Sequence, residues 1–358
     1  MIDPTLPWGH PEKYKGAFNP GNTRAAIGYS SDGIHWTGYN DGCSVTGRAA
    51  DAQNQILWDP IKDRYLLVTR TDLGAKGGLL ENRGTRVMAH VKDNDLMGYP
   101  MMWETLVTMG VDDPKDEKTP AGVPVLQMEN MNVWVYENVY FALMHVVKLG
   151  EYTGARSRKK VADPDARHES DVIDFYIGTS RDGVNYDKSW IYFEKPLIER
   201  GGRGEFDKDM VHPASEIVNH GDEHWIYYGG VYNQYHAPKE ASTQGGKVGL
   251  ATLAMDRFIS QTAEGKGTVT TKPFKVEGDM LQVNVDAKGG RFFTEVLDGD
   301  GNPIPGFTIK DAQIHNNADE LRLSQQWKDH KDISALKGKV VKLRFHLRNA
   351  KLYAFQIK

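Results

Sequence analysis

Short runs of apolar and aromatic residues, separated by clusters of turn residues, make up most of this chain. Four clear examples lie at 65–69, 133–136, 139–143 and 225–228. Runs of this length, rich in β-branched and aromatic residues and bounded by Asp, Asn, Gly and Pro, are typical of β-strands. Long stretches with helical periodicity are nearly absent, so the pattern predicts an all-β protein.

One short theme recurs four times, at 26–36, 86–93, 176–183 and 247–252. Two of the copies carry Ser-x-Asp-Gly, which indicates a strand followed by a tight turn. A unit that recurs every 60 to 90 residues or so, with strands in between, predicts the blades of a β-propeller. Asp32 and Asp182, the acids of the two Ser-x-Asp-Gly copies, are expected to bond within their own turns.

Three predicted hairpins each follow an acidic residue. Asp51 precedes the strand at 55–58, Glu129 precedes the strand at 132–135, and Asp207 precedes the strand at 210–213. The first strand of a propeller blade lines the central channel. We therefore expect Asp51, Glu129 and Asp207 to point toward a common axis, which makes them the candidate catalytic residues.

The pattern changes near residues 256–267. The segments 281–286, 291–297 and 341–347 largely alternate apolar and polar residues, as half-buried antiparallel strands do. We therefore expect two domains, a β-propeller over 1–260 and a small antiparallel β-sandwich over 261–358.

Composition and charge exclude several classes of protein. A net charge of −4 and a pI near 6.3 give no basic surface for nucleic acid or anionic lipid. No apolar run approaches the roughly 18 residues that a membrane helix needs. A single cysteine, Cys43, excludes an internal disulfide framework. The first residues do not read as a signal peptide, and we expect the full-length protein to be secreted or periplasmic.

Three stretches resemble a known group of proteins: the Ser-x-Asp-Gly run at 30–36, the run at 206–213 with 225–230 behind it, and the ending at 343–353. They resemble the bacterial polysaccharide-degrading proteins of glycoside hydrolase families 32 and 43. The resemblance spans nearly the whole chain and implies a five-bladed β-propeller followed by a β-sandwich. About four blades are evident here, so we expect either that part of the first blade is missing or that the start of the chain has diverged.

The resemblance also implies roles for the three acids. Glu129 matches the general acid, Asp51 matches the aspartate that orients and tunes, and Asp207 lies at the start of the last blade. The family's remaining carboxylate lies in the leading blade, but the first 25 residues contain no acid that matches it well, and Asp3 is a weak candidate. The alternative for each acid is that it caps a strand or pairs with an arginine such as Arg48.

Four further residues are candidates for substrate binding. Asn54, Asn130 and His212 lie on or beside predicted first strands and suit hydrogen bonds to sugar hydroxyls, although satisfying nearby backbone groups would explain them equally well. Arg203, together with Arg200, is the fourth candidate, and the pair could instead form a phosphate site.

The sequence therefore predicts a glycoside hydrolase that acts on a plant or algal polysaccharide or oligosaccharide by carboxylate acid/base chemistry. The alternatives are a non-catalytic carbohydrate-binding propeller, an inactive fragment of such an enzyme, or a phosphorylase. Carbohydrate is the expected partner, with no nucleic acid and no membrane, and the oligomeric state stays open. We expect no cofactor and no metal, because no nucleotide-binding glycine loop or metal-ligand spacing is present.

Overall fold

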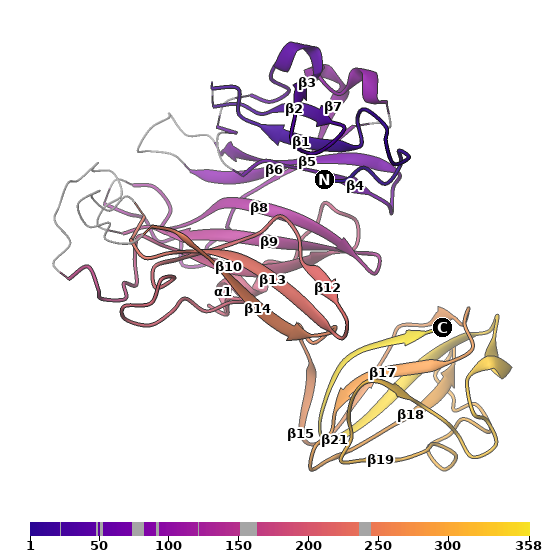
Figure 1. Ribbon diagram of the computed structural model, residues 1–358. Helices are drawn as coiled ribbons and strands as arrows, with labels where there is room; N and C mark the ends of the chain where they lie inside the picture. Colours follow the sequence, from indigo (N-terminus) through magenta and orange to yellow (C-terminus); the bar gives the residue numbers. More distant parts are fainter. Residues whose placement is uncertain are drawn as a thin grey trace. The chain divides into compact units, whose positions relative to one another are not determined.

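The computed structural model describes residues 1–21, 23–47, 49–50, 53–73, 82–90, 93–120, 122–150, 163–235 and 245–358. Strands dominate this part of the chain (Figure 1). Its helices are short, namely α1 (Ser189–Tyr192) and the 3₁₀ turns η1 (Tyr39–Gly42), η3 (Asn94–Leu96), η4 (Pro100–Met102) and η6 (Ser334–Leu336). The predicted all-β class is therefore confirmed.

The chain divides into two compact units. One comprises Met1–Ile217 and Ile226–Ala251, and the other comprises Val218–Trp225 and Thr252–Lys358. The second unit thus contains a short hairpin at 218–225 as well as the segment that was expected to form a separate domain.

The strands of the first part of the chain form consecutive sheets. The first sheet is β1-β2-β3 and the second is β4-β5-β6-β7, whereas β8 to β14 belong to one seven-stranded sheet. We call its β8-β9-β10 part the third sheet and its part with β11, β12, β13 and β14 the fourth sheet. The third and fourth sheets are joined by one parallel pairing, between Ile173 and Met210. In chain order the strands are β1 (Tyr14–Phe18), β2 (Ala26–Ser30), β3 (Thr37–Gly38), β4 (Gln55–Asp59), β5 (Arg64–Asp72), β6 (Arg83–His90), β7 (Trp103–Met109), β8 (Leu126–Tyr136), β9 (Val139–Lys148), β10 (Val172–Ser180), β11 (Met210–Pro213), β12 (Val218–His220), β13 (Glu223–Val231) and β14 (Lys247–Ala254).

The recurring theme of the sequence falls on equivalent strands. Its four copies form β2, β6, β10 and β14. β6 and β10 are each the third strand of an antiparallel meander, and β14 pairs with β13, the strand before it in the chain. β2 fits the same scheme, because an isolated bridge between Ile2 and Tyr14 supplies a strand-like segment before β1. The repeat predicted from the sequence therefore corresponds to a repeated sheet.

Apolar packing between neighbouring sheets explains why the central strands are continuous apolar runs. Tyr65 and Leu67 of β5 pack with Ile27 of the first sheet, whereas Leu66 and Val68 pack with the third sheet. All four β5 side chains are fully buried. The second sheet is thus covered on both faces, as a propeller blade is by its neighbours (Figure 1).

The first strands of three sheets meet through side-chain hydrogen bonds. The Gln55 amide of β4 donates to the carbonyl oxygens of Val133 in β8, at 3.0 Å, and of Ser215 just after β11, at 2.7 Å. The Gln55 Oε1 atom accepts the N–H of Val133 at 2.7 Å. First strands that gather in this way are the defining arrangement of blades around a channel, so the predicted propeller-type fold is confirmed.

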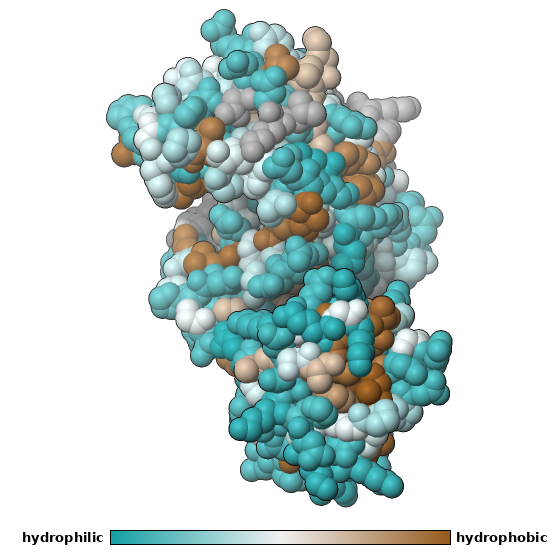
Figure 2. Space-filling view, turned by 90° about the vertical axis from the view of Figure 1, so that its right-hand side faces the viewer, coloured by the Kyte–Doolittle hydropathy of each residue, from teal (hydrophilic) through white to brown (hydrophobic). Residues whose placement is uncertain are grey.

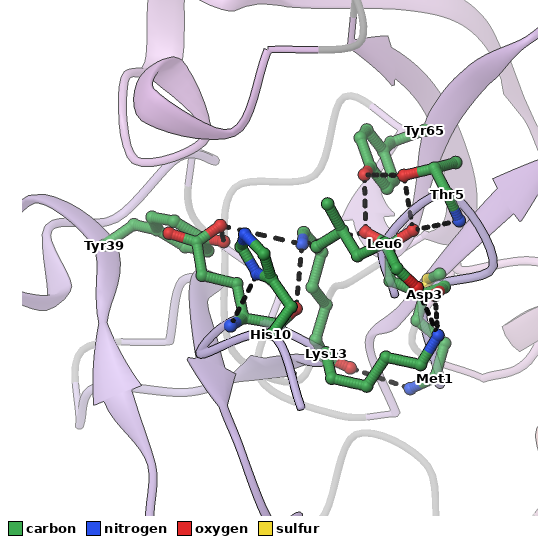
Figure 3. Close-up of polar contacts among 10 residues, drawn as sticks. Met1, Asp3, Thr5, Leu6, His10, Lys13, Tyr39 and Tyr65 are labelled. Carbon is green, nitrogen blue, oxygen red and sulfur yellow. Dashed lines mark hydrogen bonds and ion pairs between the residues drawn. The ribbon is translucent and has the colours of Figure 1, made fainter. Parts of the chain in front are cut away.

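The opening segment is held by a buried ion pair. Asp3 and Lys15 are both fully buried, and their Oδ2 and Nζ atoms lie 2.8 Å apart. The Asp3 carboxylate also accepts hydrogen bonds from the Tyr65 hydroxyl, the Thr5 hydroxyl and the Thr5 N–H (Figure 3). Because its oxygens are occupied and shielded from solvent, Asp3 serves to fix this segment on the second sheet.

The second unit is a further antiparallel sheet that encloses its own core. The 18-residue strand β21 pairs with β18 through its first half and with β17 through its second half. Side chains from both halves, including Phe345 and Leu352, share one apolar core, so the halves pack face to face as a β-sandwich. The strands are β15 (Gln261–Thr270), β16 (Phe274–Lys275), β17 (Leu281–Asp286), β18 (Arg291–Asp298), β19 (His315–Asn316), β20 (Asp319–Ser324) and β21 (Val340–Ile357).

The visible surface in Figure 2 is mainly hydrophilic, with apolar residues in separate small groups. Within the described ranges, none of the helices has the length and hydropathy of a membrane-crossing segment.

Candidate functional site

Glu129 is a nearly buried carboxylate that contacts residues from distant parts of the chain. It lies near the start of β8, and its side chain is only 12% exposed. Its Oε2 atom lies 2.9 Å from Nε of Arg83 at the start of β6, and its Oε1 atom accepts a hydrogen bond from the Tyr235 hydroxyl at 3.2 Å. The Arg83 guanidinium also lies over the Tyr235 ring. A neighbouring arginine favours the ionised form of a carboxyl group.

Tyr235 remains a hydrogen-bond donor in this cluster. Burial, followed by the negative charge of Glu129, raises the pKa of Tyr235 well above its usual value. The phenol therefore keeps its proton at neutral pH, and together with Arg83 it holds the Glu129 carboxylate in one orientation.

Asp207 precedes β11 in a tight, largely buried setting. It is 7% exposed, and its Oδ2 atom accepts a hydrogen bond from the Tyr228 hydroxyl at 2.9 Å. Burial and the Asp207 carboxylate raise the pKa of Tyr228 to about 12. Gly201 and Gly230 make room for Asp207, because a Cβ atom at either glycine would lie within 2.6 Å of an Asp207 atom.

Two predicted binding residues, Asn130 and His212, gather around one unpredicted residue, His145. Asn130 of β8 lies directly opposite His145 of β9 in the sheet register. The Nδ1 atom of His145 lies 3.2 Å from Nδ1 of His212 on β11. The amide of Asn130 donates to the backbone oxygen of Gln53, just before β4. Gln53, Asn130 and His212, which lie at the starts of β4, β8 and β11, therefore form one polar cluster with His145. We call these four residues the strand-start cluster.

The histidine pair in the strand-start cluster is neutral at physiological pH. Burial lowers the pKa of His212 to about 4. Burial, together with the charge that His212 would carry, lowers the pKa of the fully buried His145 well below its usual value. One ring can therefore donate its Nδ1 proton to the other, which a doubly protonated pair could not do.

We expect this pair to make the first unit sensitive to acid. Unfolded histidines bind protons below a pH of about 6.5, whereas folded His212 does so only near pH 4. Stability contributed by the neutral pair is thus fully present above pH 6.5 and is lost as the pH falls toward 4, by about 3 kcal/mol for His212. Urea unfolding at pH 7 and pH 4.5 should show that His212→Gln reduces this loss, whereas His10→Gln does not. An equal loss in wild type and His212→Gln would contradict the prediction.

The remaining predicted site residues have other surroundings. Asn54 bonds locally, because its amide donates to the Ala50 carbonyl oxygen and its Oδ1 atom accepts from the Thr69 hydroxyl. Arg203 is 64% exposed and pairs with Asp163 at 2.8 Å. Asp51 lies outside the described residues. The structure thus brings Asn130 and His212 together and places Arg203 in an exposed pair of its own.

Sequence reasoning missed Arg83, Tyr235 and His145. Arg83 and Tyr235 lie 46 residues before and 106 residues after Glu129 in the chain, and only the sheet order shows that they meet. Among the residues that the structure describes, no three His, Cys, Asp or Glu side chains gather closely enough to hold a metal ion.

No protein-family model and no curated protein matches the chain. Solved structures do resemble it. One is a glycoside hydrolase family 43 arabinoxylan arabinofuranohydrolase from Bacillus subtilis in complex with cellotetraose, with 9% identity, coverage of 98% of this chain and 80% of that chain, and a TM-score of 0.34. Another is the family 32 β-fructofuranosidase BmSUC1 of Bombyx mori, with 10% identity, coverage of 96% and 76%, and a TM-score of 0.34.

A third similar structure is the family 43 protein BlXynB from Bacillus licheniformis, with 9% identity, coverage of 99% of both chains and a TM-score of 0.26. All three belong to glycoside hydrolase families 43 or 32. The TM-scores lie below 0.5, and the propeller-type fold described above rests on the strand pairing of this chain itself.

Proposed function

We propose that this chain is a glycoside hydrolase that acts on a plant or algal polysaccharide or oligosaccharide. The observation that carries the proposal is the fixed, 12% exposed carboxylate of Glu129 at the start of β8, clamped by Arg83 and Tyr235. Hydrolysis of a glycosidic bond passes through an oxocarbenium-like state, which a preorganised anion stabilises or attacks.

In this proposal Glu129 acts as the ionised carboxylate, because Arg83 favours that form. The resemblance to the two families implies instead that Glu129 is the general acid, so its role is open to a direct test. Asp207 is the carboxyl group that we propose to supply the proton for the leaving oxygen, and Asp51 is proposed to keep the role of the aspartate that orients and tunes. Asn130 and His212 are proposed to bond sugar hydroxyls, and the same role for Asn54 and Arg203 stays a prediction.

A non-catalytic carbohydrate-binding protein is the second candidate. The observation that favours it is again the Arg83–Glu129 ion pair, since a carboxylate already neutralised by an arginine can serve structure alone. The two candidates differ in a single measurable property, which is bond cleavage.

The test is release of new reducing ends from purified polysaccharides, including arabinoxylan, a fructan and algal galactans, with and without inorganic phosphate. We expect release that does not depend on phosphate. Formation of a sugar 1-phosphate when inorganic phosphate is present, without new reducing ends, would identify a phosphorylase. Retention on the same polysaccharides in affinity electrophoresis, without any release, would overturn the hydrolase proposal in favour of the binding protein.

A further inference from the structure

A cavity of about 780 Å³ lies among the first strands of the propeller-type unit. Its wall includes Asn54, residues 55–58 of β4, residues 133–135 of β8, residues 15–17 of β1, and Ser215 and Glu216 after β11. Cavities of 300–1,000 Å³ or so are typical of small-molecule sites.

The cavity shares Asn54 with the predicted substrate-binding residues and adjoins the strand-start cluster there, because Asn54 follows Gln53; from that point it extends away along β8. On β8 its wall begins at Val133, four residues beyond Glu129. A strand rises about 3.3 Å per residue, so the two positions are about 13 Å apart along β8. Neither Glu129 nor Asp207 lines the cavity.

Three tryptophans, Trp36, Trp58 and Trp134, line the cavity. Trp134 is 7% exposed and stacks on Tyr136, whereas Trp36 is 49% exposed. The carboxylate of Glu216 is also exposed. The cavity therefore combines flat aromatic surface with an oxygen acceptor.

The two Ser-x-Asp-Gly turns provide an internal comparison for Trp36. In the first turn, Oδ1 of Asp32 accepts from the Ser30 hydroxyl and from the next N–H groups, at 2.8–2.9 Å. In the second, Oδ1 of Asp182 makes the equivalent bonds at 2.7–2.9 Å. Gly33 and Gly183 have nearly the same positive φ, 77° and 74°. The two turns therefore have the same geometry.

Each turn presents an aromatic residue four positions after its aspartate, and the two aromatics have different surroundings. Tyr186 of the second turn is 9% exposed and belongs to the core between the second and third sheets. Trp36 of the first turn lines the cavity and keeps half of its surface exposed. Core packing thus accounts for Tyr186 and leaves the exposed face of Trp36 unexplained.

Trp36 is also held in a fixed orientation. Its indole N–H donates to the Gly33 carbonyl oxygen at 3.2 Å. Its ring rests on the backbone of Gly16, where an added Cβ atom would lie 3.0 Å from a ring carbon. An aromatic face that is fixed before a ligand arrives loses little entropy on binding.

We propose that this cavity is a second carbohydrate-binding site, in which a sugar ring of an oligosaccharide stacks on Trp36 and its hydroxyls bond to Glu216. Sugar rings have an apolar face and polar edges, which match the tryptophan surface and the carboxylate. The site does not require the chain to be catalytic, so it can exist whether or not the proposed hydrolysis occurs.

The experiment measures binding of arabinoxylan-derived, cello- and fructo-oligosaccharides by tryptophan fluorescence and calorimetry, in a Glu129→Gln background that prevents consumption of the probe. Trp36→Ala should weaken binding of at least one probe about tenfold, and Gly16→Ala should weaken it in the same direction by displacing the ring. Trp8→Ala is the matched control, because Trp8 is 74% exposed and does not line the cavity.

Hydrolysis of a small aryl glycoside by the otherwise wild-type Trp36→Ala variant should be unchanged. Unaltered affinity of Trp36→Ala for every probe would overturn the inference, as would equal losses in Trp36→Ala and Trp8→Ala. A dimer that Trp36→Ala converts to monomer, with no effect on saccharide binding, would identify the cavity as a contact between two copies of the chain instead.

Discussion

Replacing Glu129 by glutamine is expected to lower kcat for glycoside hydrolysis by at least about 10²-fold while leaving KM nearly unchanged. Glutamine keeps the shape of the side chain and can still accept the hydrogen bond of Tyr235, but it removes the negative charge beside Arg83. The loss should therefore appear in the chemical step, where an anion stabilises positive charge on the sugar ring.

Leaving groups of different acidity separate the possible roles of Glu129. An anion that stabilises or attacks the sugar is needed for every substrate, so kcat should fall for dinitrophenyl glycosides as well as for natural linkages. Near-normal turnover of the dinitrophenyl substrate would show that Glu129 is the general acid. Glu137→Gln, at the exposed turn after the same strand, is the matched control and should retain full activity. Loss of thermal stability with unchanged kcat would show that Glu129 only pairs with Arg83.

The sequence predicted elements of the fold that depend on local pattern. The run at 65–69 reads as a buried strand because every side chain in it is apolar or small, and β5 is indeed covered on both faces. Two of the four copies of the theme carry Ser-x-Asp-Gly, and the turn chemistry of Ser, Asp and Gly is local. Asp32 and Asp182 bond within their own turns, as expected.

Contacts between distant strands could not be predicted in the same way. Nothing in the sequence near Glu129 shows that Arg83 and Tyr235 reach it, because the order of strands in space decides which side chains meet. Similarly, His212 was chosen for its position on a first strand, yet its partner His145 comes from β9 in the neighbouring sheet. Burial also separated two aromatics in identical turns, Trp36 and Tyr186, which look equivalent in the sequence.

Replacing Lys15 by methionine is expected to destabilise the first unit by about 3–5 kcal/mol at pH 7. The substitution leaves the carboxylate of Asp3 buried without its cation, although the hydrogen bonds from Tyr65 and Thr5 remain. The double variant Asp3→Asn/Lys15→Met removes both charges of this pair and should be more stable than Lys15→Met alone. Urea unfolding of the wild type, both single variants and the double variant gives the coupling energy of the pair.

The pH dependence of the Lys15→Met effect provides a second measurement. In the wild type, burial favours a raised pKa for Asp3, but the bonds from Lys15, Tyr65 and Thr5 outweigh it and hold the pKa below its usual value. The stability contributed by Asp3 is therefore present above pH 4 or so and is lost at lower pH. Without Lys15, protonation of Asp3 relieves the buried charge, so the difference in stability between Lys15→Met and wild type should shrink as the pH falls.

Lys118→Met removes an exposed pair with Asp116 and should change stability by less than about 1 kcal/mol. A Lys15→Met loss no larger than that of this control would mean that the buried pair does not hold the opening segment in place.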